Sequence, residues 1–323
     1  MRRPILAVLV IMLILLVVVR INHSRTSEVI SESPPVSLGR GGDFEFTVSI
    51  EDENRPYTLY VPQSYSADEP IPLVLFFHGG GGDMRQARSY NFEDTAEKYG
   101  FAVAFLNGDS AFPNGRLATW NAGACCGRAR DTESDDVGYV RAVVADIQAQ
   151  FSIADNKIFA TGMSNGAMMS YRLACEASDI FAAIAPVAGT DSTSSCNPVN
   201  PVSVLHIHAL DDTHVLFEGG AGEDAFNDLS QVTEFTSVAD SVSLWLAHND
   251  ITSPMTRILD VDGAYCDTRE RQDGEAAVTL CVTETGGHSW PGSDVGTDFR
   301  NKTPSQAINA NEVIWEFFNT HHR

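Results

Sequence analysis

The sequence predicts an open α/β fold, in which a mostly parallel sheet carries helices on both faces. Residues 73–77 and similar stretches are continuously apolar, as is typical of strands that are buried on both sides. Strand-like and helix-like segments alternate four times, which favours parallel strands joined by helical crossovers. With 323 residues and 43% hydrophobic content, the chain can form one large core. Ligands bind such sheets at the carboxyl ends of the strands, so polar motifs at those ends are the candidate functional residues.

Each element is assigned from its local pattern. Residues 44–50 and 57–61 alternate apolar with polar side chains around an acidic turn, which predicts an antiparallel hairpin at the N-terminal edge of the sheet. Later strands are placed where β-branched and aromatic residues gather, and helices where strong helix formers do. Strands are expected at residues 73–77, 101–106, 157–160, 181–187 and 202–208 and in a hairpin at 266–282, and helices at 86–99, 135–150, 167–177, 240–248 and 304–318.

Two segments precede the predicted domain. Arg2 and Arg3 stand before an unbroken apolar run at residues 5–19, which is the arrangement of an export signal. The run is short for a transmembrane span, yet no small-x-small cleavage site follows it, so a cleaved signal peptide and a retained membrane anchor over residues 1–21 both stay open. Residues 22–42 are expected to be a flexible linker and residues 43–323 the folded domain, located outside the cell or in the periplasm.

A serine between glycines is the first chemical motif. The segment GMSNG at residues 162–166 has the G-x-S-x-G form and lies between a predicted strand and a predicted helix. Glycines allow a sharp turn there, which lifts the Ser164 hydroxyl clear of the sheet. The Asn165 backbone N–H then lies at a helix N-terminus, where it can stabilise a developing negative charge.

A glycine run follows the first buried strand. HGGGG at residues 78–82 lets the backbone come close to a ligand, and this run resembles the loop that supplies the other oxyanion N–H in esterases, from Gly80. The long loop at residues 107–132 is expected to form one wall of a binding cleft. Asp135 and Asp136 begin the next helix, and capping explains these two acids better than catalysis.

An acid and a histidine complete a catalytic set. Asp211 and Asp212 follow the strand at 202–208, which is the position of an aspartate that orients a catalytic base, and His288 lies on a loop after the last strand. The order Ser164, Asp212 (or Asp211), His288 is the order expected of α/β-hydrolases. His288 would accept the serine proton, while the aspartate would hold the imidazole and stabilise its charged form.

Metal and cofactor sites are not expected. His206 and His208 face the same side of one strand, but no third ligand stands at metal spacing. The six cysteines indicate disulfides, because no C-x-x-C pair is present. Cys266 and Cys281 flank the predicted hairpin and are paired. Cys125 and Cys126 are adjacent, and a bond between them would strain the peptide, so each is expected to bond elsewhere, with Cys175 and Cys196 as candidates. Six cysteines allow fifteen connectivities, and the sequence does not choose among them.

The charge of the chain limits its partners. The formal net charge of −22 argues against nucleic acid, since phosphate binding requires clustered Lys and Arg. Polyanionic substrates are disfavoured for the same reason, whereas neutral polymers and small esters remain open. The chain is expected to be a monomer.

At these motifs the chain resembles the secreted esterases of the polyhydroxybutyrate depolymerase and feruloyl or acetylxylan esterase family of α/β-hydrolases. The resemblance runs from about residue 57 to the C-terminus and rests on LVLFFHGGGG, TWNAGACCG, GMSNGAMMSYRLACE with AAIAPVAG, HALDDT and GGHSWPG. Family members read H-G-T-x-D at the acid, which places the family aspartate on Asp212, although Ala209 and Leu210 stand where Gly and Thr are usual.

The resemblance implies ester hydrolysis through an acyl-enzyme, without metal or organic cofactor. The favoured substrates are feruloyl or acetyl esters on plant cell-wall polysaccharide, and the alternative is depolymerisation of polyhydroxybutyrate. The resemblance also implies that Trp120 and Trp290 form walls of the substrate cleft. Packing in the core is an equally good interpretation of each of these residues. A non-catalytic binding protein on the same fold is the alternative from another class, and it predicts that a member of the Ser-Asp-His set is missing.

Overall fold

The computed structural model describes residues 39–50, 53–225, 234–294 and 303–323. The expectations for residues 1–21, and for the linker up to residue 38, lie outside these ranges. No helix within them is long and apolar enough to cross a membrane.

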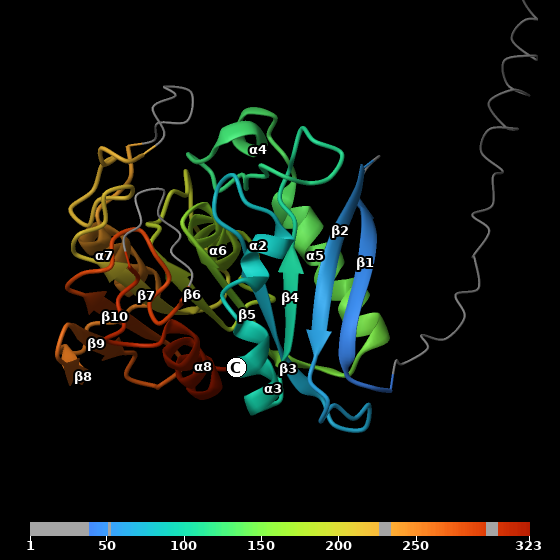
Figure 1. Ribbon diagram of the computed structural model, residues 1–323. Coiled ribbons are helices and arrows are strands. Elements are labelled where there is room, and N and C mark those ends of the chain that lie inside the picture. Colours follow the sequence, from blue (N-terminus) through green and yellow to red (C-terminus); the bar gives the residue numbers. More distant parts are fainter. Residues whose placement is uncertain (1–38, 51–52, 226–233, 295–302) are drawn as a thin grey trace, which may run out of the picture. The chain divides into compact units, whose positions relative to one another are not determined.

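One sheet of ten strands forms the centre of the described structure (Figure 1). Its strand order is β1-β2-β4-β3-β5-β6-β7-β10-β9-β8. The six central strands are parallel, whereas the two strands at each edge run antiparallel to their neighbours. The strands are β1 (Gly42–Ile50), β2 (Glu53–Val61), β3 (Ile71–Phe77), β4 (Ala102–Leu106), β5 (Ile153–Met163), β6 (Ala183–Val187), β7 (Ser203–Ala209), β8 (Thr256–Val261), β9 (Ala264–Glu270) and β10 (Ala277–Thr283).

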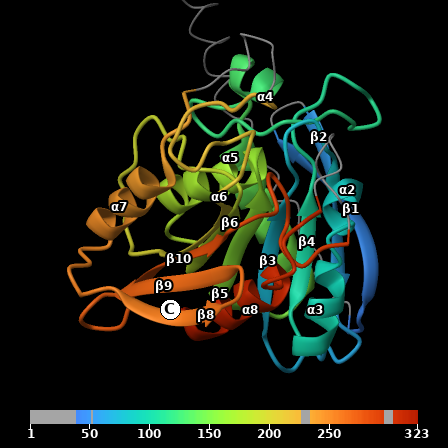
Figure 2. The ribbon, with the colours of Figure 1, turned by 60° about the vertical axis from the view of Figure 1, so that its left-hand side comes forward.

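Helices cover both faces of the sheet. One apolar core lies between the sheet and helices α5 (Asp136–Gln150), α6 (Asn165–Glu176) and α7 (Val238–His248). A second core lies between the other face and helices α2 (Met84–Arg88), α3 (Phe92–Tyr99) and α8 (Ala310–Thr320). Figure 1 shows α3 and α8 on the near side of the sheet and α5 behind it, and Figure 2 shows β8 and β9 at the edge opposite β1. The predicted α/β class, with helices on both faces and an antiparallel N-terminal hairpin, is confirmed.

Several elements differ from the prediction. Helix α4 (Gly127–Asp131) lies within the expected loop at residues 107–132, and β5 begins at Ile153 rather than at residue 157. The helix expected at residues 86–99 is two helices, because Asn91 between them adopts the left-handed conformation (φ 55°), which ends a continuous helix. The last helix begins at Ala310 rather than at residue 304, since the Asn309 side chain caps it by accepting from the backbone N–H groups of Asn311 and Glu312. Strand β8 was not predicted, and its mostly exposed residues show no alternating pattern.

The cysteines of the described structure form three disulfides. Cys266 bonds to Cys281 across the β9–β10 pair, as predicted. Cys175 bonds to Cys196, and Cys125 bonds to its neighbour Cys126. The expectation that the adjacent pair would reach elsewhere was therefore wrong. That expectation rested on the strain that such a bond puts on the peptide between the two residues, whose Cα atoms lie 3.1 Å apart.

Candidate active site

Ser164 lies on the sharp turn that the flanking glycines predicted. It separates β5 from α6 and has φ 57° and ψ −120°, a conformation that residues with side chains rarely adopt. A Cβ atom on Gly162 would lie 2.5 Å from the Phe77 carbonyl oxygen, and one on Gly166 would overlap the same oxygen. Only glycine at both positions lets this turn pack directly against the end of β3.

Two backbone N–H groups beside Ser164 are available to a ligand. Gly80 follows β3 and Asn165 begins α6, and both residues line the same cavity as Ser164. Within the described residues, neither of their N–H groups donates a hydrogen bond to another protein group. These are the two N–H groups that the sequence predicts for an oxyanion site, and the positive end of the α6 dipole lies beside the N–H of Asn165.

The side chains of His78 and Asn165 stabilise this site by hydrogen bonds, and the sequence predicts no such role for them. His78 accepts from the Gly108 N–H at Nε2 (3.0 Å), and its Nδ1 lies 2.8 Å from the Gly79 carbonyl oxygen. The Asn165 side chain accepts from the Trp120 N–H (2.7 Å) and donates to the Trp120 carbonyl oxygen (2.9 Å). The glycine loop, the serine turn and the 107–132 loop are therefore tied together. A buried histidine directly before a glycine run was the available signal.

His288 and Asp212 form the expected pair. His288 Nδ1 lies 2.8 Å from Asp212 Oδ2, and both side chains are buried. Asp212 Oδ1 accepts from the backbone N–H groups of His214 (2.8 Å) and Val215 (3.0 Å). Asp211 instead accepts from the Gly287 N–H at 2.7 Å. The structure thus places Asp212 at the histidine and uses Asp211 to hold the loop before it.

The Asp212 carboxylate is stabilised in its charged form. Burial alone would raise its pKa, but the charge interaction with His288 and hydrogen bonds from His208 and His288 outweigh that effect. The pKa of Asp212 is therefore held well below its usual range. A permanently ionised carboxylate keeps the proton of His288 on Nδ1 and leaves Nε2 to act on a serine.

In the described residues, one group of three side chains lies close enough together to hold a metal ion. Asp212, His214 and His288 each offer a ligand atom within 4.8 Å of the others. The hydrogen bond between Asp212 and His288 accounts for the first contact. Ring stacking accounts for the second, since the His214 and His288 centroids lie 4.6 Å apart at an angle of 13°. We assign no ion to this group.

An apolar cavity of about 370 Å³ opens beside Ser164. The 107–132 loop supplies much of its lining, as expected of a cleft wall, and α6 and the segment after β7 supply the rest. Phe112 and Leu117 stand at its rim, with 52% and 61% of their surface exposed. His214, whose ring stacks on that of His288, also lines the cavity. Its other apolar lining residues are Ala111, Met168, Val215, Ala221, Ala225 and Phe235.

The two tryptophans lie in the core rather than in the wall of this cavity. Trp120 is fully buried, packs against Phe77 and donates from Nε1 to the His78 carbonyl oxygen at 3.0 Å. Trp290 packs on the opposite face of the sheet against Phe76 and Tyr90. Of the two interpretations given for each tryptophan, cleft wall or core packing, the structure therefore shows core packing for both residues.

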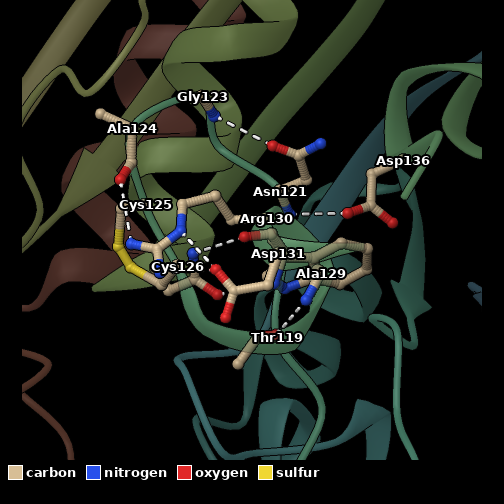
Figure 3. The surroundings of a disulfide bond; sticks show 12 residues. Thr119, Asn121, Gly123, Ala124, Cys125, Cys126, Ala129, Arg130, Asp131 and Asp136 are labelled. Carbon is tan, nitrogen blue, oxygen red and sulfur yellow. Dashed lines mark hydrogen bonds and ion pairs between the residues drawn. A yellow bond between two sulfur atoms is a disulfide. The ribbon is translucent and has the colours of Figure 1, made fainter. Parts of the chain in front are cut away.

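The adjacent disulfide forms part of the cavity wall. Cys126 lines the cavity, and Cys125 packs with Met168 and Val215 in a small apolar cluster. Figure 3 shows the surrounding loop, in which the Ala129 N–H donates to the Thr119 hydroxyl. The disulfide thus presents an apolar surface at a fixed place next to the serine turn.

The fold and this arrangement of loops at the carboxyl ends of β3, β5, β7 and β10 define an α/β-hydrolase. A family model described as esterase PHB depolymerase matches residues 55–279, and the chain belongs to this family.

Similar proteins carry esterase names. Feruloyl esterase B of Piromyces equi is 28% identical over 256 residues, which cover 76% of this chain and 44% of that protein. A probable feruloyl esterase C of Aspergillus niger is 30% identical over 174 residues, which cover 51% of this chain and 58% of that protein. The matches thus span about half the length of these relatives. The structure of an acetyl xylan esterase from Aspergillus awamori shares the fold, with a TM-score of 0.58 and 14% identity, over 87% of this chain and 100% of that one.

Proposed function

We propose that this chain is a serine esterase that hydrolyses carboxylic esters through an acyl-enzyme on Ser164. The observation that carries the proposal is the buried His288–Asp212 pair, with its 2.8 Å contact, at the same sheet edge as the strained serine turn. Membership of the esterase family supports it. The alternative of a non-catalytic binding protein predicts that a member of the set is absent, and all three residues are present.

In the proposed reaction, Ser164 Oγ attacks the ester carbonyl carbon and His288 Nε2 accepts the hydroxyl proton. The N–H groups of Gly80 and Asn165 hold the oxyanion of the tetrahedral intermediate. The C–O bond of the ester breaks, and His288 returns the proton to the departing alcohol. Water then attacks the acyl-enzyme with His288 as base, which releases the acid and restores Ser164.

The cavity favours an aromatic acyl group over an acetyl group. Its volume of about 370 Å³ greatly exceeds that of an acetyl group, and its apolar lining would leave a small polar substrate poorly contacted. A feruloyl group would bury its ring against Met168 and Phe235. We therefore infer a feruloyl-type ester as the substrate class. Hydroxyalkanoate oligomers are the second candidate, favoured by the family description and by the exposed Phe112 and Leu117 at the rim.

The test compares hydrolysis of methyl ferulate, an acetylated xylo-oligosaccharide and a hydroxybutyrate trimer by the wild type and Ser164→Ala. We expect the substitution to lower kcat on each good substrate by at least about a thousandfold, because the nucleophile is lost. Ser170→Ala is the matched control, since this buried hydroxyl donates to the Gly166 carbonyl oxygen in the same helix and lies outside the site. Full activity in Ser164→Ala would end the nucleophile assignment.

The order of kcat/KM among the three substrates tests the acyl group. Methyl ferulate is expected to rank first, and Phe235→Ala should lower kcat/KM for methyl ferulate more than for the acetylated substrate. A higher kcat/KM for the trimer than for methyl ferulate would favour the polyester alternative.

We also propose that the chain is exported. Three disulfides in the described residues are the form expected in an oxidising compartment. The apolar run at residues 5–19 supplies the signal or anchor.

A further inference from the structure

Two buried histidines stand directly behind the Asp212 carboxylate. His206 and His208 lie two residues apart on β7, so their side chains share one face of the sheet, and both are essentially inaccessible to solvent. Their rings lie side by side, with centroids 5.2 Å apart and planes only 5° from parallel. The reaction proposed above uses neither ring, although buried imidazoles must have their nitrogens satisfied.

A continuous chain of contacts runs from α6 to the acid. Tyr171 Oη lies 2.7 Å from His206 Nδ1, and His206 Nε2 lies 3.1 Å from His208 Nδ1. His208 Nε2 faces two acceptors, the Val215 carbonyl oxygen at 2.8 Å and Asp212 Oδ2 at 3.2 Å. The same Asp212 oxygen receives the hydrogen bond of His288.

The acceptors fix the position of each proton in this chain. His208 Nε2 must carry a proton, because a carbonyl oxygen and a carboxylate can only accept. Its Nδ1 then accepts in the uncharged ring, so the proton of His206 lies on Nε2. His206 Nδ1 in turn accepts from the Tyr171 hydroxyl, which bonds to no other residue in the described structure. Every donor in the chain has at least one acceptor, and every ring nitrogen is used.

Burial supports the uncharged forms of His206 and Tyr171. It lowers the pKa of His206 well below its usual value, and neighbouring His208 lowers it further. Burial also raises the pKa of Tyr171, and the nearby Asp191 carboxylate adds to this effect, so the hydroxyl keeps its proton. The titratable groups that face the chain are Asp191 at the Tyr171 end and Asp212, with its partner His288, at the other.

His208 contacts two points of the turn that carries Asp212, the Val215 carbonyl oxygen and the Asp212 carboxylate. Its contact with Val215 fixes the carbonyl oxygen of the residue whose N–H donates to Asp212 Oδ1. Its contact with Asp212 Oδ2 fixes the other oxygen. Both oxygens of the carboxylate are therefore held by hydrogen bonds while Oδ2 faces His288.

We propose that His208, oriented by His206 and Tyr171, is a positioning residue that aims the Asp212 carboxylate at His288 and shares its negative charge. This inference rests on the proposed esterase function. An N–H that shares the charge of the carboxylate weakens its hold on the imidazolium form of His288, so loss of His208 should make His288 more basic. In the alternative, the two histidines are satisfied core residues without influence on His288.

The kinetic test compares His208→Phe, His208→Gln and Tyr171→Phe with the wild type, each first checked for a cooperative thermal transition. In His208→Phe we expect kcat to fall by about tenfold or more with KM little changed, because the acid loses its fixed orientation. The acid limb of the kcat/KM profile should also move to higher pH, by about half a unit. His208→Gln, whose amide can donate to both acceptors, should recover most of kcat.

Tyr171→Phe should also lower kcat and move the acid limb to higher pH, but by less than His208→Phe does. The reason is that the missing hydroxyl no longer fixes the position of the His206 proton. His248→Gln is the matched control, because this histidine lies on α7 outside the chain of contacts and its change should leave kcat and the acid limb unmoved. A folded His208→Phe with unchanged kcat and an unmoved acid limb would overturn the proposal, even if its melting temperature were lower.

Imidazole ¹⁵N chemical shifts of the wild type test the chain without any substrate. Both His206 and His208 are expected as the uncharged form with the proton on Nε2. A proton on Nδ1 of either ring would refute the chain of contacts. Should the wild type hydrolyse none of the esters, the proposed function would fail while these shifts still decided the arrangement of His206 and His208.

Discussion

His78 shows how one buried ring can couple the site to pH. Its imidazole sits between the Gly79 carbonyl oxygen and the Gly108 N–H, which requires an uncharged Nε2 that accepts. Burial lowers the pKa of His78 to about 4, against a smaller opposing effect of the hydrogen bond to Gly79. A charged ring would break the contact with Gly108 and loosen the glycine loop that carries Gly80.

This residue makes the stability of the fold depend on pH. Between pH 6.5 and 4 the unfolded chain binds a proton at His78 that the folded chain does not, so the free energy of unfolding falls as the pH falls through this window. The loss attributable to His78 should reach about 3 kcal/mol at pH 4. His206, with its lowered pKa, acts in the same direction. Urea unfolding at pH 7 and pH 4.5 measures the effect.

In His78→Gln the free energy of unfolding should depend less on pH. The glutamine amide does not titrate, yet its oxygen can accept from the Gly108 N–H. His322→Gln, at the exposed C-terminus, is the control and should follow the wild type. Identical pH dependence in His78→Gln and the wild type would show that His78 is not the source.

At the scale of elements, the start of α5 is held by a buried ion pair. The sequence predicts a capping role for Asp135 and Asp136, and Asp135 does cap the helix by accepting from the Gly138 N–H at 2.8 Å. Asp136 instead lies 2.6 Å from the Arg55 guanidinium and accepts from the Asn121 N–H at 2.7 Å. Its side chain is fully buried, so the pair joins β2, α5 and the 107–132 loop.

Arg55→Met should destabilise the fold by about 3 to 5 kcal/mol, because it leaves the Asp136 carboxylate buried without its charge partner. The double variant Arg55→Met, Asp136→Asn should recover part of the loss. Arg141→Met removes a partly exposed partner of Asp179 and should change stability by about 1 kcal/mol or less. Equal effects of the two single variants in urea unfolding would contradict the role assigned to Arg55.

Elements were predictable where their signal is local. The serine turn is marked by two glycines within five residues, and strand β3 is marked by an unbroken apolar run. Both elements could therefore be identified from the sequence. Asn91 gave no comparable signal, since its left-handed conformation depends on how the two short helices pack. Strand β8 is paired on one side only and is mostly exposed, so its sequence carries little of the alternation that marks a strand.

Over the whole molecule, the predictable part of the site was the order of its motifs along the chain. Each motif follows its own strand, so a parallel sheet brings them to one edge. The contacts behind them were not predictable, because they join residues far apart in sequence. His206 and Tyr171 are separated by 35 positions, and Arg55 and Asp136 come from different elements. The Cys125–Cys126 bond was not predicted, because strain in the peptide between adjacent cysteines argued against it.

The net charge of the whole chain sets its response to salt. A formal charge of −22 means that repulsion between carboxylates outweighs the attraction within ion pairs such as Arg141–Asp179. Added salt screens both, with a screening length of about 10 Å at 0.1 M, and should weaken the larger repulsive contribution more. We therefore expect the melting temperature at pH 7 to rise by a few degrees, roughly 1 kcal/mol in stability, between 0.02 and 0.3 M NaCl. The same comparison near pH 4.6, where the chain carries no net charge, is the control and should show little or no rise. A melting temperature that falls with salt at pH 7 would mean that attractive ion pairs, and not the excess of acidic residues, dominate the electrostatics of this fold.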